Sequence, residues 1–112
     1  MKGAQEETLA LEYLQARHMQ LVTRNFRCRG GELDLVMRER DTLVIAEVRK
    51  RANPNFGSAA ESVDSRKQAR LIHAAQLFLA GHDEFSKSPV RFDVVTLDGA
   101  NRIEWYKDAF DA

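Results

Sequence analysis

Two apolar segments that follow one another in the chain each carry a carboxylate, and this feature limits the possible folds more than any other. Leu33–Met37 and Leu43–Val48 have the composition of β-strands and are joined by a polar turn. Asp34 lies inside the first segment and Glu47 near the end of the second. Since burying an unpaired carboxylate is costly, these residues belong either to an ion-pair cluster at the end of a sheet or to a functional site.

The rest of the chain predicts an α/β fold in which helices flank a mixed five-stranded sheet, in the order helix, three strands, helix, two strands. The expected elements are a helix over Ala4–His18, strands over Met19–Arg29, Leu33–Met37 and Leu43–Val48, a long helix ending at Gly81, and strands over Val90–Leu97 and Arg102–Tyr106. Asp64 is one candidate N-cap for the long helix, and Ser58 with a capping box to Glu61 is the alternative. Because this helix connects the third strand to the fourth, we expect those two strands to be parallel. Residues 1–112 are expected to form a single domain.

The composition argues against several classes of protein. Lysine and arginine total 17, as do aspartate and glutamate, so bulk electrostatic attraction does not hold the chain on nucleic acid, although a local basic patch can. Cys28 is the single cysteine and predicts a reducing compartment. No apolar run reaches the roughly 18 residues that span a membrane, and the first residues lack the pattern of a signal peptide. We therefore expect a cytoplasmic protein that does not insert into a membrane.

The alternation of side chains along a strand determines which residues can meet. Glu47 shares a face with Ile45 and Arg49, whereas Lys50 points to the opposite face. If the two acidic segments pair as a hairpin, Asp34 can lie close to Glu47. Two converging carboxylates need a cation, which is either a divalent metal ion or an arginine such as Arg49. The spacing alone favours the ion-pair cluster.

A set of short motifs extends over nearly the whole chain. In order, they are Gly3-x-x-x-Glu7-x-x-Ala10-x-x-Tyr13-Leu14, Arg24-Asn25-Phe26-Arg27, Gly31-Glu32-Leu33-Asp34-Leu35, Glu47-Val48-Arg49-x-Arg51, Phe56-Gly57, Glu61-Ser62-Val63, Lys67-x-x-Arg70-Leu71 and Arg91-Phe92-Asp93-Val94-Val95. Together they resemble the YraN family of small bacterial proteins. That family is similar to the PD-(D/E)XK nuclease-like superfamily, close to archaeal-type Holliday junction resolvases. The resemblance implies a restriction-endonuclease-like fold with the active site at the sheet edge.

The resemblance also implies a role for each matching acid. Asp34 and Glu47 would be two ligands of a Mg²⁺ or Mn²⁺ ion, and the backbone carbonyl of Val48 would be a third ligand. Glu7, on the first helix, matches the additional acid of resolvase-like members. These four residues are therefore the candidates for a metal-dependent site.

Position 49 departs from the superfamily pattern, which has lysine where this chain has Arg49. Arginine keeps the positive charge and can stabilise a phosphate transition state, but it is effectively never deprotonated. Lys67, near the start of the long helix, is a candidate for the missing amine; the alternative is that it lies on a solvated helix face. Arg49 and Lys67 thus join Asp34, Glu47 and Glu7 as candidate catalytic residues.

Five arginines are candidate contacts for a nucleic-acid backbone, because guanidinium groups pair well with phosphate. They are Arg24, Arg27, Arg29, Arg51 and Arg70. The alternative for the first three is an ordinary charged edge strand, and for Arg70 a solvated helix surface.

The leading hypothesis is a metal-dependent endonuclease that hydrolyses phosphodiester bonds in DNA, with branched DNA as the candidate substrate. A homodimer fits this hypothesis, because resolvases of this fold usually act as dimers across a two-fold junction. Two alternatives stay open. One is a non-catalytic nucleic-acid-binding module on the same fold, which Arg49 favours. The other is an interaction protein that uses the aromatic end of the chain, where Trp105, Tyr106 and Phe110 lie.

Overall fold

The computed structural model of the protein describes residues 3–51 and 63–112. Its elements are, in chain order, α1 (Ala4–Gln15), β1 (Gln20–Cys28), β2 (Gly31–Glu39), β3 (Thr42–Lys50), α2 (Ser65–Ala80), the 3-10 helix η2 (Asp83–Phe85), β4 (Val90–Leu97) and β5 (Ile103–Phe110). The predicted α/β class, the mixed five-stranded sheet and the order of the elements are confirmed. Asp64 is the N-cap of α2, and the alternative start at Ser58 lies outside the described residues.

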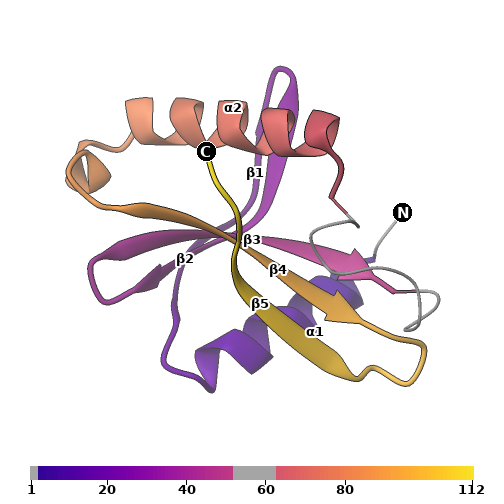
Figure 1. Ribbon diagram of the computed structural model, residues 1–112. Coiled ribbons are helices and arrows are strands. Elements are labelled where there is room, and N and C mark those ends of the chain that lie inside the picture. The colour runs from indigo at the N-terminus through magenta and orange to yellow at the C-terminus, as the bar shows by residue number, and fades with distance from the viewer. Residues whose placement is uncertain (1–2, 52–62) are drawn as a thin grey trace.

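The five strands pair in sequence order, from β1 at one edge to β5 at the other. Neighbouring strands are antiparallel except β3 and β4, which are parallel. This parallel pair confirms the expected role of α2 as the connection between them. The two helices cover opposite faces of the sheet, with α2 above and α1 below in Figure 1.

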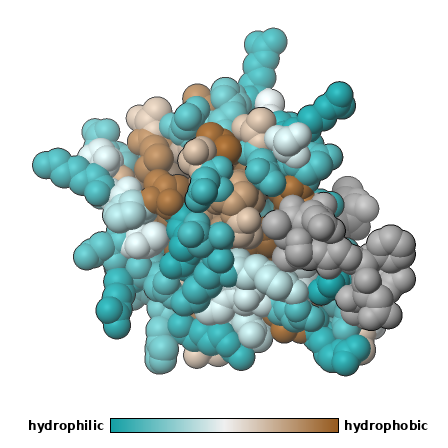
Figure 2. All heavy atoms as spheres, viewed as in Figure 1, coloured by the Kyte–Doolittle hydropathy of each residue, from teal (hydrophilic) through white to brown (hydrophobic). Residues whose placement is uncertain are grey.

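Each face of the sheet carries its own apolar core, because side chains alternate along the strands. Leu43 and Ile45 of β3 belong to the core under α2, whereas Val44, Ala46 and Val48 belong to the core under α1. Most of the surface is hydrophilic in the view of Figure 2, with smaller hydrophobic groups between the polar side chains. None of the described helices is long and apolar enough to cross a membrane.

The β1–β2 hairpin extends beyond the part of β2 that pairs with β3. β2 pairs with β1 as far as Gly31, but its pairing with β3 stops at Leu35 and Ala46. The free end of the hairpin lies beside α2 (Figure 1). Gly31 permits this approach, because a Cβ there would lie 2.7 Å from the backbone carbonyl oxygen of Arg70. The two strands therefore separate directly beyond the last pair, at Asp34 and Glu47.

The bounds of β1, β2 and β3 differ from the prediction by one or two residues at an end, and α1 and β5 differ more. α1 ends at Gln15 and does not continue to His18, whose φ of 71° is left-handed. β5 continues past Tyr106 to Phe110. The longer strand is stabilised by Asp93 on β4, whose carboxylate accepts a hydrogen bond from the backbone N–H of Asp108. The differences at α1 and β5 depend on backbone conformation or on contacts that hydrophobic periodicity does not reveal.

Candidate functional site

Asp34 and Glu47 lie where β2 and β3 stop pairing. Asp34 is 3% exposed and Glu47 is 1% exposed, so both carboxylates are almost completely removed from solvent. Oδ2 of Asp34 accepts a hydrogen bond of 3.0 Å from the backbone N–H of Val48, across the gap between the strands. Because the N–H and C=O of one strand residue point to the same edge, we expect the Val48 carbonyl to face this gap as well. The gap is therefore bordered by backbone groups as well as carboxylates.

Asp34 belongs to a group of three carboxylates. One oxygen from each of Glu7, Glu32 and Asp34 lies within 4.8 Å of the others. Glu7 reaches the group because it falls on the buried face of α1, three residues before Ala10. It is 6% exposed, and Nη2 of Arg24 on β1 lies 3.8 Å from its Oε1. Glu7 of α1 and Asp34 of β2, which are far apart in the chain, are thus brought together in one group.

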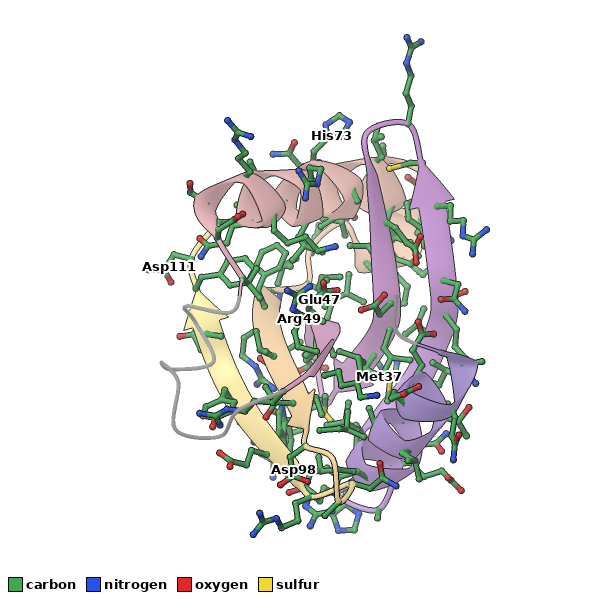
Figure 3. All side chains as sticks on the ribbon, turned by 90° about the vertical axis from the view of Figure 1, so that its right-hand side faces the viewer. Met37, Glu47, Arg49, His73, Asp98 and Asp111 are labelled. Atoms are coloured by element: carbon green, nitrogen blue, oxygen red, sulfur yellow. The ribbon has the colours of Figure 1, made fainter. Side chains whose placement is uncertain are left out.

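Glu47 has different neighbours, on the side of the sheet that α2 covers. Nζ of Lys67 lies 3.1 Å from Oε2 of Glu47, and Nη1 of Arg49 lies 4.0 Å from the same oxygen. Lys67 is in the first turn of α2, which is fixed by a 2.8 Å hydrogen bond from Lys67 N to the side chain of Asp64. Figure 3 shows Glu47 and Arg49 close together beneath α2. Lys67 therefore points at a buried carboxylate and does not lie free on a solvated helix face.

The three-carboxylate group has the chemistry of a divalent-metal site. Mg²⁺ and Mn²⁺ prefer oxygen ligands, and two ligands on opposite sides of a Mg²⁺ ion are about 4.2 Å apart. Oxygens that lie within 4.8 Å of one another can enter one coordination shell after small side-chain movements. Glu7, Glu32 and Asp34 are therefore the side chains that would hold the ion, with the Val48 carbonyl at the same gap. Glu47, which the resemblance includes among the ligands, is held by Lys67.

The acids border an open cleft of about 610 Å³ between the start of α1, the hairpin and the end of β3. Among the described residues, four cations also line it, namely Arg27, Arg49, Lys50 and Lys67. Lys50 lies on the opposite face of β3 from Glu47, as predicted, with its Nζ 4.0 Å from Glu6 of α1. Acids of which two are buried, beside cations that reach the solvent, suit an anionic ligand that is bound through a metal ion as well as through direct ion pairs.

Of the five arginines predicted to contact nucleic acid, Arg27 lines this cleft, and Arg24 contacts Glu7, an acid that lines it. Arg27 lines it with a side chain that is 77% exposed and that lies 3.5 Å from Glu32. Arg24 is less exposed and donates a hydrogen bond to Thr8 as well as lying near Glu7. Arg27 can therefore reach a ligand directly, whereas Arg24 supports the acid on α1.

The other three arginines are not among the described residues that line the cleft. Arg51 contacts the side chains of Glu104 and Tyr106 on β5. Arg29 is exposed at the hairpin turn, and Arg70 is exposed on α2. The structure thus separates them from Asp34 and does not combine all five into one surface.

Comparison with known proteins relates this site to a family. The model of "Uncharacterised protein family UPF0102" matches residues 6–97. The chain belongs to this family. Among its relatives, a UPF0102 protein of Pseudomonas putida (strain GB-1) is 50% identical over 113 residues, which cover 97% of this chain and 92% of the relative. A UPF0102 protein of Nitrosomonas europaea is 47% identical over 112 residues, covering 98% of this chain and 93% of the relative.

UPF0102 is the YraN family that the sequence motifs resemble, so that prediction is confirmed. The matched region includes every acid of the cleft and ends at Leu97, before β5 begins. All the described residues that line the cleft, except Ala4, therefore lie in the part of the chain that matches the UPF0102 family model.

Glu32 is a residue of the site that the sequence analysis did not select. It lies two residues before Asp34 on β2, so the two side chains share a strand face, and it belongs to the same Gly31-Glu32-Leu33-Asp34 motif. The sequence contained that signal. The sequence did not show that Glu7 lies beside Glu32 and Asp34, so the group of three acids was not recognised.

Asp93 is a further buried acid in the motifs, and it lies outside the cleft. Its carboxylate accepts hydrogen bonds of 2.8 and 2.9 Å from Arg91, and another of 2.9 Å from the indole N–H of Trp105. Trp105 packs against the core under α1, whereas Tyr106 and Phe110 pack against the core under α2. Asp93 and these three aromatic residues therefore hold β5 on the sheet.

Proposed function

We propose that this UPF0102 protein is a metal-dependent endonuclease that hydrolyses phosphodiester bonds in DNA, with branched DNA as its candidate substrate. One observation carries the proposal: where β2 and β3 separate, Asp34 and Glu32 meet Glu7 of α1 at an open cleft. The cleft is also lined by Lys67 of α2, which contacts Glu47. The resemblance to PD-(D/E)XK nucleases supports the proposal, because that superfamily uses acids at the strand positions of Asp34 and Glu47.

The residues of the cleft have separate tasks in this proposal. Glu7, Glu32 and Asp34 would hold Mg²⁺ or Mn²⁺. The bound ion would supply Lewis-acid stabilisation of the phosphate and lower the pKa of a bound water. Lys67 and Glu47 form a proton-bearing pair 3.1 Å apart that can orient the attacking water. Arg49 keeps its charge at any working pH and can stabilise the negative charge that develops on the phosphate.

Lys67 matters here because Arg49 occupies the strand position where the superfamily has lysine. An ammonium group is a compact charge with three rotatable donors, whereas a guanidinium group is a planar fork of five donors. A lysine that reaches Glu47 from α2 supplies the missing amine from another element. The departure at position 49 therefore leaves the cleft with a guanidinium group from β3 and an ammonium group from α2.

The test is cleavage of labelled four-way junction, duplex and single-stranded DNA in Mg²⁺ or Mn²⁺. We expect Asp34→Asn and Glu47→Gln each to lower the rate by about 100-fold or more, the range for groups that act directly in catalysis. Glu84→Gln, in the exposed 3-10 helix η2 away from the cleft, is the matched control and should leave the rate unchanged. Wild-type protein that cleaves none of these substrates, or acid variants that cleave normally, would refute the proposal.

Arg49 also supports a second candidate, a non-catalytic nucleic-acid-binding module on the same fold. In that case the acids would form an ion-pair cluster with Lys67 and Arg49. DNA binding would survive EDTA as well as Asp34→Asn and Glu47→Gln, and no substrate would be cut. Binding that requires both the metal ion and the acids would exclude this alternative.

A further inference from the structure

A second hollow lies at the other end of the sheet from the cleft, beside the β2–β3 turn. It has a volume of about 450 Å³ and is lined by Arg17, His18, Glu39, Arg40, Thr42 and Lys107. Arg17 and His18 follow the end of α1, Arg40 is in the turn, and Lys107 is on β5. We call Arg17, His18, Arg40 and Lys107 the distal basic surface.

The distal basic surface carries more positive charge than its neighbours neutralise. Among residues 3–51 and 63–112, neither Arg17 nor Arg40 forms an ion pair. Glu39 is the acid that lines the hollow, and its carboxylate is bound by Arg91 at 2.7 Å and by Lys107 at 3.2 Å. The arginines of the surface are therefore left to act on an external anion.

Arg17 is held in place in a way that favours such a contact. Its Nη1 donates a hydrogen bond of 3.1 Å to the carbonyl oxygen of Tyr13, and its guanidinium lies 3.4 Å from the centroid of the Tyr13 ring. Its other N–H groups can still bind phosphate oxygens. A guanidinium that is already ordered loses less conformational freedom when a ligand binds.

The hollow on the other side of the β2–β3 turn provides a comparison within the same molecule. It has a similar volume, about 440 Å³. Its described charged lining residues are three cations and three acids, namely Arg38, Arg40, Lys87, Asp41, Asp83 and Glu84. That hollow has no excess of either charge. Arg40 lines both hollows, and without it the distal one still has Arg17 and Lys107 against Glu39. The excess is specific to the side where Arg17, His18 and Lys107 lie.

α1 connects the cleft to the distal basic surface. Ala4 and Glu7 line the cleft at one end of the helix, and Arg17 follows its other end. Arg17 is ten positions after Glu7 and two past the end of α1. At about 1.5 Å per residue this is about 15 Å, which equals four to five steps of about 3.4 Å along a DNA strand. Between these two residues α1 exposes Thr8, Glu12 and Gln15, of which Glu12 alone is charged.

We infer that the distal basic surface binds the phosphate backbone of a DNA duplex that extends along α1 from the cleft. The inference rests on the proposed function, since it takes DNA to be the ligand, and it adds a contact site that is separate from the acids. Charge complementarity supports this occupant, because a duplex presents closely spaced phosphates to Arg17 and Arg40. The inference also predicts that Glu12 weakens DNA binding, because Glu12 is the one negative charge on the exposed side of α1 between the two sites.

The experiment measures duplex binding in EDTA, by fluorescence anisotropy of a labelled 20-base-pair DNA over a range of salt concentrations. Each phosphate contact that is lost should reduce the slope of log K against log salt by about 0.9. We expect this reduction for Arg17→Gln and for Arg40→Gln, and about twice as much for the double variant. Arg102→Gln is the matched control, because its side chain is 78% exposed and paired with Asp98 away from both sites. Glu12→Gln should strengthen binding about two- to threefold, the size of one exposed charge interaction.

The outcomes separate this inference from the proposed function. Slopes that stay the same in both arginine variants, or a wild-type protein whose duplex binding does not depend on salt, would overturn the inference. Cleavage in Mg²⁺ by the same variants would leave the proposed function standing in that case. Reduced slopes without cleavage by the wild type would support the inference while refuting the nuclease. An equal reduction in Arg102→Gln would also overturn it, because the effect would then reflect net charge alone.

Discussion

Replacing Lys67 by methionine tests the contact on which the arrangement of the site depends. Methionine keeps most of the length and the apolar part of the side chain, and it removes the ammonium group that lies 3.1 Å from Glu47. Glu47 is 1% exposed, so its charge would be left in a buried position with less compensation. We therefore expect Lys67→Met to destabilise the folded protein.

The magnitude follows from the burial of the two partners. Removing one member of a fully buried ion pair costs about 3–5 kcal/mol. The Lys67 side chain is 26% exposed and Arg49 stays 4.0 Å from Glu47, so the loss should be smaller. We expect about 2 kcal/mol, which in a domain of this size lowers Tm by about 8 °C. Because the cost comes from the charge on Glu47, adding Glu47→Gln should recover at least about 1 kcal/mol of it.

The assay is urea unfolding of the wild type, the two single variants and the double variant, followed by circular dichroism. Lys87→Met, in the exposed segment after η2, is a control for removing a lysine without removing this contact. Effects of Lys67→Met and Glu47→Gln that add within about 0.3 kcal/mol would refute the reasoning, because independent sites behave in that way. A loss as large in Lys87→Met would refute it too.

Three further changes test other parts of the structure. Gly31→Ala should cost about 1–3 kcal/mol, because its Cβ meets the backbone of α2; Gly99→Ala, which meets no atom within 4 Å, should cost less, and equal losses would contradict the close approach. The hydrogen bond from Arg91 lowers the pKa of Glu39, so Glu39 stabilises the fold above the ordinary glutamate pKa and loses this effect as pH falls through the lowered value. The free energy of unfolding should therefore decline less steeply in acid for Glu39→Gln than for the wild type. Parallel pH curves for the two proteins would argue against this role of Glu39. Glu32→Gln should weaken Mn²⁺ binding about tenfold or more by calorimetry, and unchanged affinity would remove Glu32 from the metal site.

Local sequence signals predicted most of the fold. The alternation in Leu43–Val48 predicted which of its apolar side chains share a sheet face, and Asp64 and Gly81 marked the two ends of α2. These signals work because they depend on neighbours in the chain. The end of β5 was not predictable in this way, since it depends on a hydrogen bond from Asp108 to Asp93 on another strand.

The site was predictable in its components and not in their grouping. Asp34, Glu47 and Glu7 stood out as acids among apolar neighbours or within motifs. The sequence does not show that Glu47 meets Lys67, which is 20 positions later, because that contact depends on where α2 crosses the sheet. Nor does it show that the pairing of β2 with β3 stops at Leu35, which determines the partners of each carboxylate.

The same chain contains an example of what a purely structural carboxylate looks like, and it helps to weigh the two interpretations of the cleft. Asp93 is fully buried, and its oxygens are taken up by Arg91, by Trp105 and by the backbone of β5. It borders neither the cleft nor the hollows described above. Asp34 is buried almost as deeply, yet it lines an open cleft of about 610 Å³ where water, a metal ion and a phosphate can enter. Burial stabilises the geometry of both acids, but access to a ligand distinguishes Asp34 from Asp93, and this difference favours a functional site over an ion-pair cluster.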